Sequence, residues 1–208
     1  MKFRFHLVLA VMASLIVPSC TSTQLAHSWR DTSYTAGPLR KILVVAVRKN
    51  QARRRAWEDG FAGALWRHGV DATPSYCLIP TTLPDTSFID SIARNGNFDG
   101  IMLIGKSSTR TTENVTPSLD ITSTGSPSEP WSESYYEYYD REYYPGYPVI
   151  HETVNDEIKI WITHGSERMI WSGVGEVHES GEDEDVSDKI ISLIVEALVK
   201  QEVIAAAI

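Results

Sequence analysis

Hydrophobic and polar positions alternate along the chain with periods that predict strands and helices in turn. Residues 41–47 read KILVVAV, an almost continuous aliphatic run that is typical of a strand buried on both faces. Residues 51–68 place apolar side chains on one helical face, and Gly69 suits the end of that helix. Residues 70–76 alternate as a strand does, and Pro74 predicts a position at a sheet edge or near the end of the strand.

The second half of the chain continues this alternation of elements. Residues 150–163 alternate, with Val154, Ile158, Ile160 and Ile162 on one face, which predicts an antiparallel strand with its other face in solvent. The other expected elements are a short helix from Asp85 or Thr86 to Asn95 and Gly96, a buried strand at 101–104, a returning strand at 169–178 and an amphipathic helix at 186–198.

This element order predicts a single three-layer α/β domain over residues 40–208. The first three strands follow a β-α-β-α-β order, and right-handed crossovers would make them parallel. The hairpin would extend the sheet in antiparallel fashion, and the last helix would pack on it. A Ser-, Thr- and Tyr-rich insertion at about 107–149 precedes the hairpin, and connections of this length are usually functional or disordered.

The first 19 residues have the pattern of an export signal. Lys2 and Arg4 form a short positive segment, and residues 7–17 form an apolar run. At about 1.5 Å per helical residue this run covers roughly 16 Å, which is too short for a bilayer core of about 30 Å. We therefore expect residues 1–19 to be a cleaved signal peptide rather than a membrane-spanning helix.

Residues 17–20 read Val-Pro-Ser-Cys and resemble the lipobox of bacterial lipoproteins. The resemblance implies cleavage after Ser19 and a diacylglyceryl group on the Cys20 thiol, with a further acyl chain such as palmitate on the new amine. Two or three chains, at about 0.8 kcal/mol per buried methylene, would hold the protein on a membrane permanently. Thr21 is not the aspartate that marks inner-membrane retention in enterobacterial lipoproteins, so the periplasmic face of the outer membrane is expected. The alternative is an ordinary signal peptide with a chance cysteine.

Residues 20–39 are mainly polar and contain the serine, threonine, glycine and proline residues that are typical of linkers. We expect them to form a lipidated N-terminus followed by a tether. Trp29 would dock this tether to the domain.

Four segments make the chain similar to a group of bacterial proteins. The segments are Ser28-Trp29-Arg30-Asp31, Ile42-Leu43-Val44-Val45, Arg54-Arg55-Ala56-Trp57-Glu58-Asp59 and Ile170-Trp171-Ser172-Gly173. They resemble uncharacterised envelope lipoproteins with a small α/β domain. More distantly, the element order is similar to curli-secretion lipoproteins and to the N-terminal domain of the Tol-system translocation protein. The resemblance implies an envelope location and a fold, without a catalytic signature.

The amino-acid composition excludes several classes of partner and of site. The chain has 19 Lys and Arg residues and 27 Asp and Glu residues, which gives a net charge of −8. Cleavage after residue 19 would remove two cations and no acidic residue, so the net charge of the mature chain would be −10. This charge argues against nucleic-acid binding and against a face that lies flat on anionic lipid. Two cysteines exclude a disulfide scaffold and a four-cysteine zinc site.

A basic segment after the first predicted strand is a candidate ligand site. Ligands of open α/β sheets bind beyond the carboxyl ends of the strands, and helix N-termini attract anions. If the first strand lies between the second and third, the cations that line this crevice are Arg48, Lys49, Arg53 and Lys106. A phosphate or carboxylate would be the ligand. The alternative is a solvated basic face that pairs with acidic residues 178–188.

Seven of the nine tyrosines lie close together in the insertion. Tyrosine rings suit sugar stacking and protein interfaces, so a recognition loop for envelope proteins or peptidoglycan is one interpretation. A solvated insertion without a partner is the other. The residues are Tyr135, Tyr136, Tyr138, Tyr139, Tyr143, Tyr144 and Tyr147.

Other candidate chemistry is sparse. Cys77 is expected to be a small buried side chain. The acidic run at 178–188 is expected to favour the start of the last helix, with a weak cation site as the alternative. No histidine pair has metal-ligand spacing and no Gly-x-Ser-x-Gly elbow is present, so we expect neither a metal, a cofactor nor an enzyme.

Together these patterns predict a non-catalytic, lipid-anchored envelope protein that binds or organises other envelope components. A module that binds small anions in the basic crevice is the second hypothesis. A hydrolase with unrecognised residues is the third.

Overall fold

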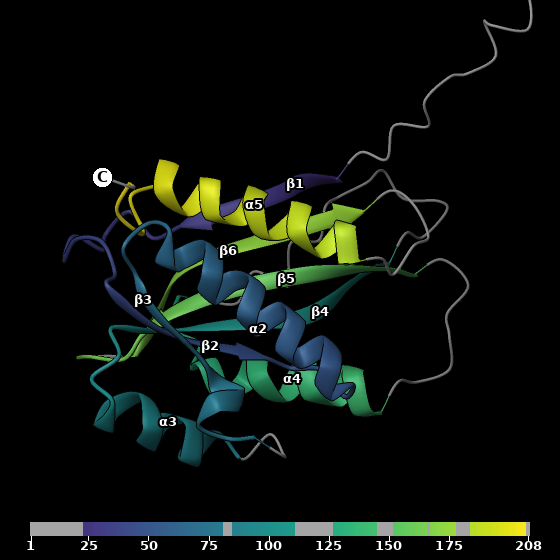
Figure 1. The fold of residues 1–208 in the computed structure, drawn as a ribbon, viewed down its shortest axis with the longest axis horizontal. Helices are drawn as coiled ribbons and strands as arrows, with labels where there is room; N and C mark the ends of the chain where they lie inside the picture. The colour runs from purple at the N-terminus through teal and green to yellow at the C-terminus, as the bar shows by residue number, and fades with distance from the viewer. Residues whose placement is uncertain are drawn as a thin grey trace, which may run out of the picture.

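The computed structural model describes residues 23–80, 85–110, 127–144, 152–165, 167–177 and 184–206. A six-stranded mixed sheet lies between two helical layers, which confirms the predicted three-layer α/β domain (Figure 1). Its elements are β1 (Thr23–Arg30), β2 (Lys41–Ala46), α2 (Gln51–Trp66), β3 (Asp71–Pro74), the 3-10 turn η2 (Ser75–Cys77), α3 (Thr86–Asn95), β4 (Gly100–Arg110), α4 (Trp131–Tyr143), β5 (Glu152–Ile162), β6 (Arg168–Val177) and α5 (Glu184–Lys200).

The strand order is β1-β6-β5-β4-β2-β3. β2 is parallel to both of its neighbours, β3 and β4, so the first predicted strand does lie between the second and the third. β5 and β6 form the predicted antiparallel hairpin beside β4. β3 is an edge strand, in agreement with the prediction from Pro74.

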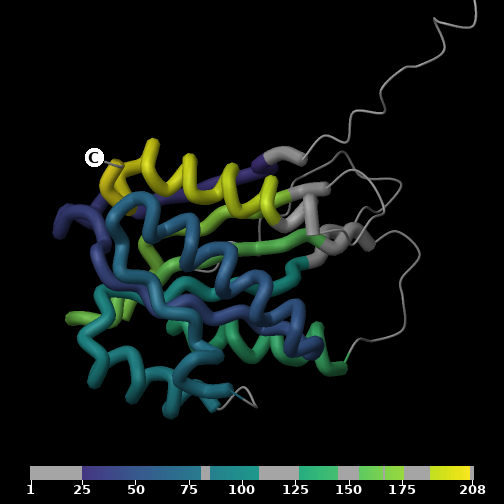
Figure 2. Tube along the Cα trace, viewed as in Figure 1, coloured from purple at the N-terminus to yellow at the C-terminus, as the bar shows by residue number. Residues whose placement is uncertain are grey.

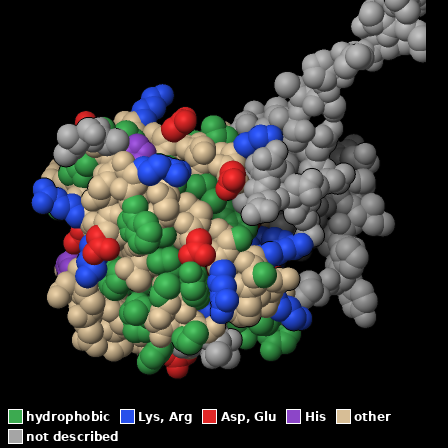
Figure 3. All heavy atoms as spheres, in the orientation of Figure 1, with side chains coloured by type: hydrophobic (Ala, Val, Ile, Leu, Met, Phe, Trp, Pro, Cys, Tyr) green, Lys and Arg blue, Asp and Glu red, His purple; other side chains and the backbone are tan. Residues whose placement is uncertain are grey.

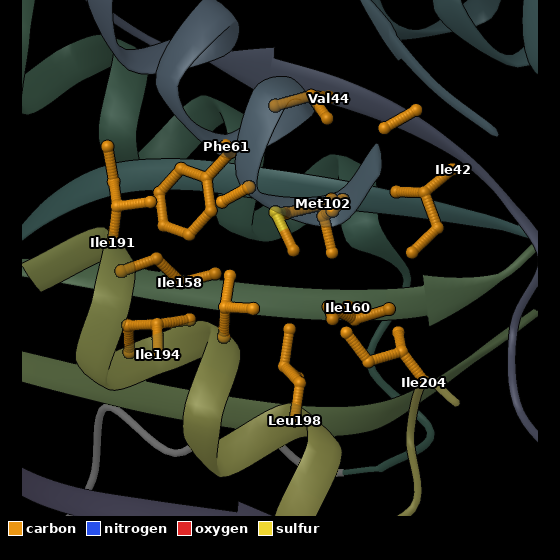
Figure 4. Packing of buried hydrophobic residues seen from close by; sticks show 14 of the residues in the cluster. Ile42, Val44, Phe61, Met102, Ile158, Ile160, Ile191, Ile194, Leu198 and Ile204 are labelled. Carbon is orange, nitrogen blue, oxygen red and sulfur yellow. The ribbon is translucent and has the colours of Figure 1, made fainter. Parts of the chain in front are cut away.

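The aliphatic run of β2 is continuous because both of its faces are buried. Ile42, Val44 and Ala46 point into a core beneath α2 and α5, and the intervening Leu43, Val45 and Val47 point into a second core beneath α3 and α4. Figure 4 shows the first core. Its labelled side chains come from strands, both helices and the C-terminal segment: Ile42, Val44, Met102, Ile158, Ile160, Phe61, Ile191, Ile194, Leu198 and Ile204.

The expected tether at 20–39 is wrong for residues 23–30, which form the edge strand β1. β1 pairs with β6 in antiparallel register from Thr23 opposite Val177 to Arg30 opposite Trp171. Trp29 packs against the second core, as expected, but as part of the sheet. Thr23, the first residue that the structure describes, is thus already paired in the sheet.

The expected loop at 107–149 is also corrected. Residues 107–110 continue β4, and residues 131–143 form α4. The buried residues of α4, which are Trp131, Ser134, Tyr135 and Tyr138, recur with helical spacing and face the sheet. The rest of the insertion lies outside the described residues.

Arg54 belongs to a buried polar network rather than to a solvated basic face. Its side chain and that of Glu58 are both fully buried, with Nε 3.0 Å from Glu58 Oε1. Arg54 Nη2 donates to Ser75 Oγ at 2.9 Å, and Ser75 Oγ donates to Glu58 Oε1 at 2.7 Å. The backbone N–H groups of Ala46 and Tyr76 complete the shell around the carboxylate. This network joins β2, α2 and η2.

Substitution of Gly105 tests how closely α4 packs on the sheet. A Cβ added at Gly105 would overlap the Tyr138 ring, whereas a Cβ at Gly63 in α2 meets nothing within 4 Å. We expect Gly105→Ala to lower the free energy of unfolding by about 1–3 kcal/mol through overpacking. The control Gly63→Ala should raise it by up to about 1 kcal/mol through helix propensity. Urea unfolding measures both, and equal effects of the two variants would contradict this packing.

Candidate functional site

The strand registers bring several predicted site residues to one end of the sheet. Ala46 lies opposite Ile104 on β4, Ser108 on β4 lies opposite Val154 on β5, and Val177 on β6 lies opposite Thr23. The start of β1 and the carboxyl ends of β2 and β4 therefore share an end, which we call the Thr23 end (Figures 1 and 2). The opposite end, where β1 finishes, is the Arg30 end.

Arg48 follows β2 at the Thr23 end and is buried, with 2% of its side chain exposed. Its Nη2 donates to Asp156 Oδ1 at 2.5 Å, and its Nη1 donates to the Val47 carbonyl at 3.0 Å. The guanidinium lies 5.2 Å from the ring centre of Trp57, a cation–π arrangement. Burial raises the pKa of Asp156, and the positive charges of Arg48 and Lys106 oppose that rise. Asp156 thus neutralises the most buried cation of the predicted crevice.

The other three predicted cations lie around this pair. Lys106 is partly buried and lies opposite Asp156 in the β4–β5 register. Lys49 is exposed, and its backbone N–H donates to Glu142 Oε1 at 2.9 Å. Arg53 is exposed in the first turn of α2.

The start of α2 already has an internal acceptor for its backbone. Asn50 is the N-cap, and its Oδ1 accepts hydrogen bonds from the N–H groups of Ala52 at 2.9 Å and Arg53 at 3.2 Å. The helix N-terminus therefore offers fewer donors to an external anion than the sequence predicts.

The crevice holds two carboxylates, Asp156 and Glu142, beside its four cations. The sequence interpretation missed Asp156 and Glu142, which come from β5 and α4. On the face that carries α2, Lys and Arg side chains are interspersed with Asp and Glu rather than forming a field of one sign (Figure 3). The Arg48–Asp156 ion pair and the capped start of α2 favour a structural role for these residues over a strong anion site.

A second polar cluster lies on the other side of the sheet, beneath α4. Glu157 and Lys159 are each 1% exposed, with Nζ 3.5 Å from Glu157 Oε1. The Tyr138 hydroxyl donates to Glu157 Oε2 at 2.8 Å, and Lys159 Nζ donates to Ser134 Oγ at 3.3 Å. Burial, followed by the charge of Glu157, raises the pKa of Tyr138 well above 10.0. Because all four side chains are buried, the cluster attaches α4 to β5 and presents no open reaction centre.

Five of the seven tyrosines lie on α4 and Tyr144 directly follows it, rather than on the expected recognition loop. Tyr135 and Tyr138 are buried, whereas Tyr136 is 49% and Tyr144 is 73% exposed. Tyr139 is partly buried and stacks on Tyr143 at 4.2 Å with an interplanar angle of 12°, and on Tyr135 at 6.1 Å. These ring faces are occupied by one another, which limits their use for stacking on sugars. Tyr147 lies outside the described residues.

The remaining candidates give no assembled site. Cys77 is exposed in η2, which corrects the expectation that it is buried. Residues 178–183 of the acidic run lie outside the described residues. Within the part of the chain that the structure describes, no three His, Cys, Asp or Glu side chains are grouped to hold a metal ion. Each helix among these same residues is too short or too polar to span a bilayer.

The buried cluster beneath α4 makes a pH-dependent prediction. Burial raises the pKa of Glu157 above its ordinary value of 4.5, against the opposing effects of Lys159 and Tyr138. The folded protein therefore binds this proton more tightly than the unfolded chain, and ionisation of Glu157 lowers stability as pH rises above 4.5. We expect the free energy of unfolding of Glu157→Gln, relative to wild type, to increase from pH 4.5 towards neutrality in urea titrations. A difference that stays constant or falls would contradict this assignment.

Comparisons with known proteins assign no family. No family model matches the chain, and no curated protein matches it. Among solved structures, the chain is similar to the PelC dodecamer from Paraburkholderia phytofirmans, with 12% identity, a TM-score of 0.43, and coverage of 87% of this chain and 98% of that one. A substituted PelC dodecamer from the same organism has 12% identity, a TM-score of 0.40, and coverage of 86% and 96%.

Proposed function

We propose that the protein is a non-catalytic lipoprotein of the bacterial envelope, anchored through Cys20 at the periplasmic face of the outer membrane. Its domain would bind or organise other envelope components. The lipobox-like residues 17–20 support the anchor. That sequence is the observation that carries the proposal, and the start of β1 at Thr23, three residues after the cysteine, supports a position of the domain close to the anchor.

This short connection determines how an anchored domain would be held. Three residues reach at most about 10 Å, whereas the 18 residues of the expected tether would reach roughly 60 Å. β1 is hydrogen-bonded to β6 from its first residue, so no long linker separates the acyl chains from the sheet. An anchored Cys20 would hold the Thr23 end within about 10 Å of the membrane surface.

The same geometry separates two surfaces. β1 has eight residues, so the Arg30 end lies about 24 Å from the Thr23 end at about 3.4 Å per residue. The Arg30 end and the helical flanks would be the surfaces open to envelope partners. The competing hypothesis of an anion module at Arg48 is less favoured, because Asp156 already neutralises that guanidinium.

Lipid attachment is tested by substitution of the two cysteines in turn. We expect palmitate label to be incorporated by the wild type and lost by at least about tenfold in Cys20→Ser, because the thiol receives the diacylglyceryl group. Cys77→Ser is the matched control, since Cys77 is exposed and should keep the label at the wild-type level. Unchanged labelling of Cys20→Ser would contradict the proposal, as would loss of label in Cys77→Ser alone.

A further inference from the structure

A groove opens at the Arg30 end, away from the residues discussed above. Its volume is about 690 Å³, within the range of small-molecule pockets. The end of β1, the segment that follows it, and the end of α5 with the next residues form its walls. The lining residues that matter below are Arg30, Tyr34, Pro38, Lys200, Glu202 and Ile204.

The groove contains two cations, Arg30 and Lys200, that form no ion pair in the part of the chain that the structure describes. Within the described residues, no Asp or Glu lies at ion-pair distance from Arg30 or Lys200. The Nε of Arg30 is buried and has no hydrogen-bond acceptor there. Asp31, next to it in sequence, is instead engaged by Arg168 and by the N–H and hydroxyl of Ser33.

Tyr34 adds a neutral donor to this wall. Burial raises its pKa, the charge of Asp99 adds to the rise, and the charges of Arg168 and Arg30 oppose it. The phenol is therefore protonated at neutral pH and close enough to Arg30 to feel its charge. A guanidinium and a phenol on one wall form a donor set suited to carboxylate or phosphate oxygens.

The walls are fixed by backbone contacts. Leu39 forms a parallel bridge with Ile204, and its N–H donates to the Val203 carbonyl at 2.9 Å. Glu202 has a φ of 57°, a left-handed conformation that is uncommon for a residue other than glycine. Glu202 has this conformation because it caps the C-terminus of α5, where its N–H donates to the Val199 carbonyl at 3.0 Å and that of Val203 donates to the Leu198 carbonyl at 2.9 Å. The groove is therefore defined by tertiary contacts rather than by a loose terminal segment.

We infer that this groove binds a small organic molecule with one carboxylate or phosphate group and an apolar portion. The acidic group would pair bidentately with Arg30, with Lys200 and the Tyr34 hydroxyl as further donors. Glu202 leaves the lining with a net charge of +1, which suits a ligand with a single acidic group. Pro38 and Ile204 would contact the apolar portion. The inference does not depend on the lipid anchor, because the groove lies at the opposite end of β1.

Binding is tested on the full-length protein in detergent by saturation-transfer NMR, with phenyl phosphate and benzoate as probes. We expect transfer to at least one of these anions, with none to the uncharged benzyl alcohol. Arg30→Gln should reduce the signal at least about fivefold, because the guanidinium supplies the bidentate contact. Lys49→Gln, which removes an exposed cation at the Thr23 end, should leave it unchanged.

The unfolding temperature of Arg30→Gln shows whether this variant is folded. Lys200→Gln, at the exposed end of α5, is a second variant that should also reduce the saturation-transfer signal. No transfer to either anion in the wild type would overturn the inference. Saturation-transfer signals that are equal in the wild type and in both groove variants would also overturn the inference. A loss of signal in Lys49→Gln as large as that in Arg30→Gln would overturn it too.

Discussion

The backbone pairing of β1 with β6 determines the orientation of this domain relative to Cys20. The pairing begins at Thr23 and runs without a long gap to Arg30, apart from an irregularity between Leu25 and His27. It fixes which end of the sheet is nearest to Cys20, and it directs the chain to the opposite end before β2 begins. The Arg48–Asp156 ion pair and the groove at Arg30 consequently lie at opposite ends of one sheet. A free tether over the same residues would give neither end a defined position.

Buried charges locate the helices on this sheet. Arg54 and Glu58 join α2 to η2, Arg48 and Asp156 join the end of β2 to β5, and Lys159 lies with Glu157 beneath α4. Such pairs gain little net stability over apolar residues of the same shape, but removal of one partner costs about 3–5 kcal/mol. Displacement of α2 or α4 from its position would therefore leave a buried charge without its partner.

The sequence predicts the elements whose pattern is local. The β2 run and the helix beginning after Asp85 are correct because burial on two faces and N-capping leave a signature within a few residues. β1 was missed because its polar residues resemble a linker and its strand pairing lies about 140 residues away in β6. α4 was missed because its buried face is built from Trp131, Tyr135 and Tyr138, in a segment whose composition suggests a loop. The match between Arg48 and Asp156, 108 residues apart, has no local signature.

The central claim is that the Thr23 end, and not a flexible tether, lies next to the membrane. The most direct measurement is energy transfer from a fluorophore on the lipidated protein to acceptors on phosphatidylcholine headgroups in vesicles. The fluorophore would be attached at Lys49→Cys or at Thr35→Cys, in a Cys77→Ser background. Because the two ends are about 24 Å apart along β1, transfer should be clearly more efficient from position 49 than from position 35. Equal transfer from the two positions, or stronger transfer from position 35, would contradict the account.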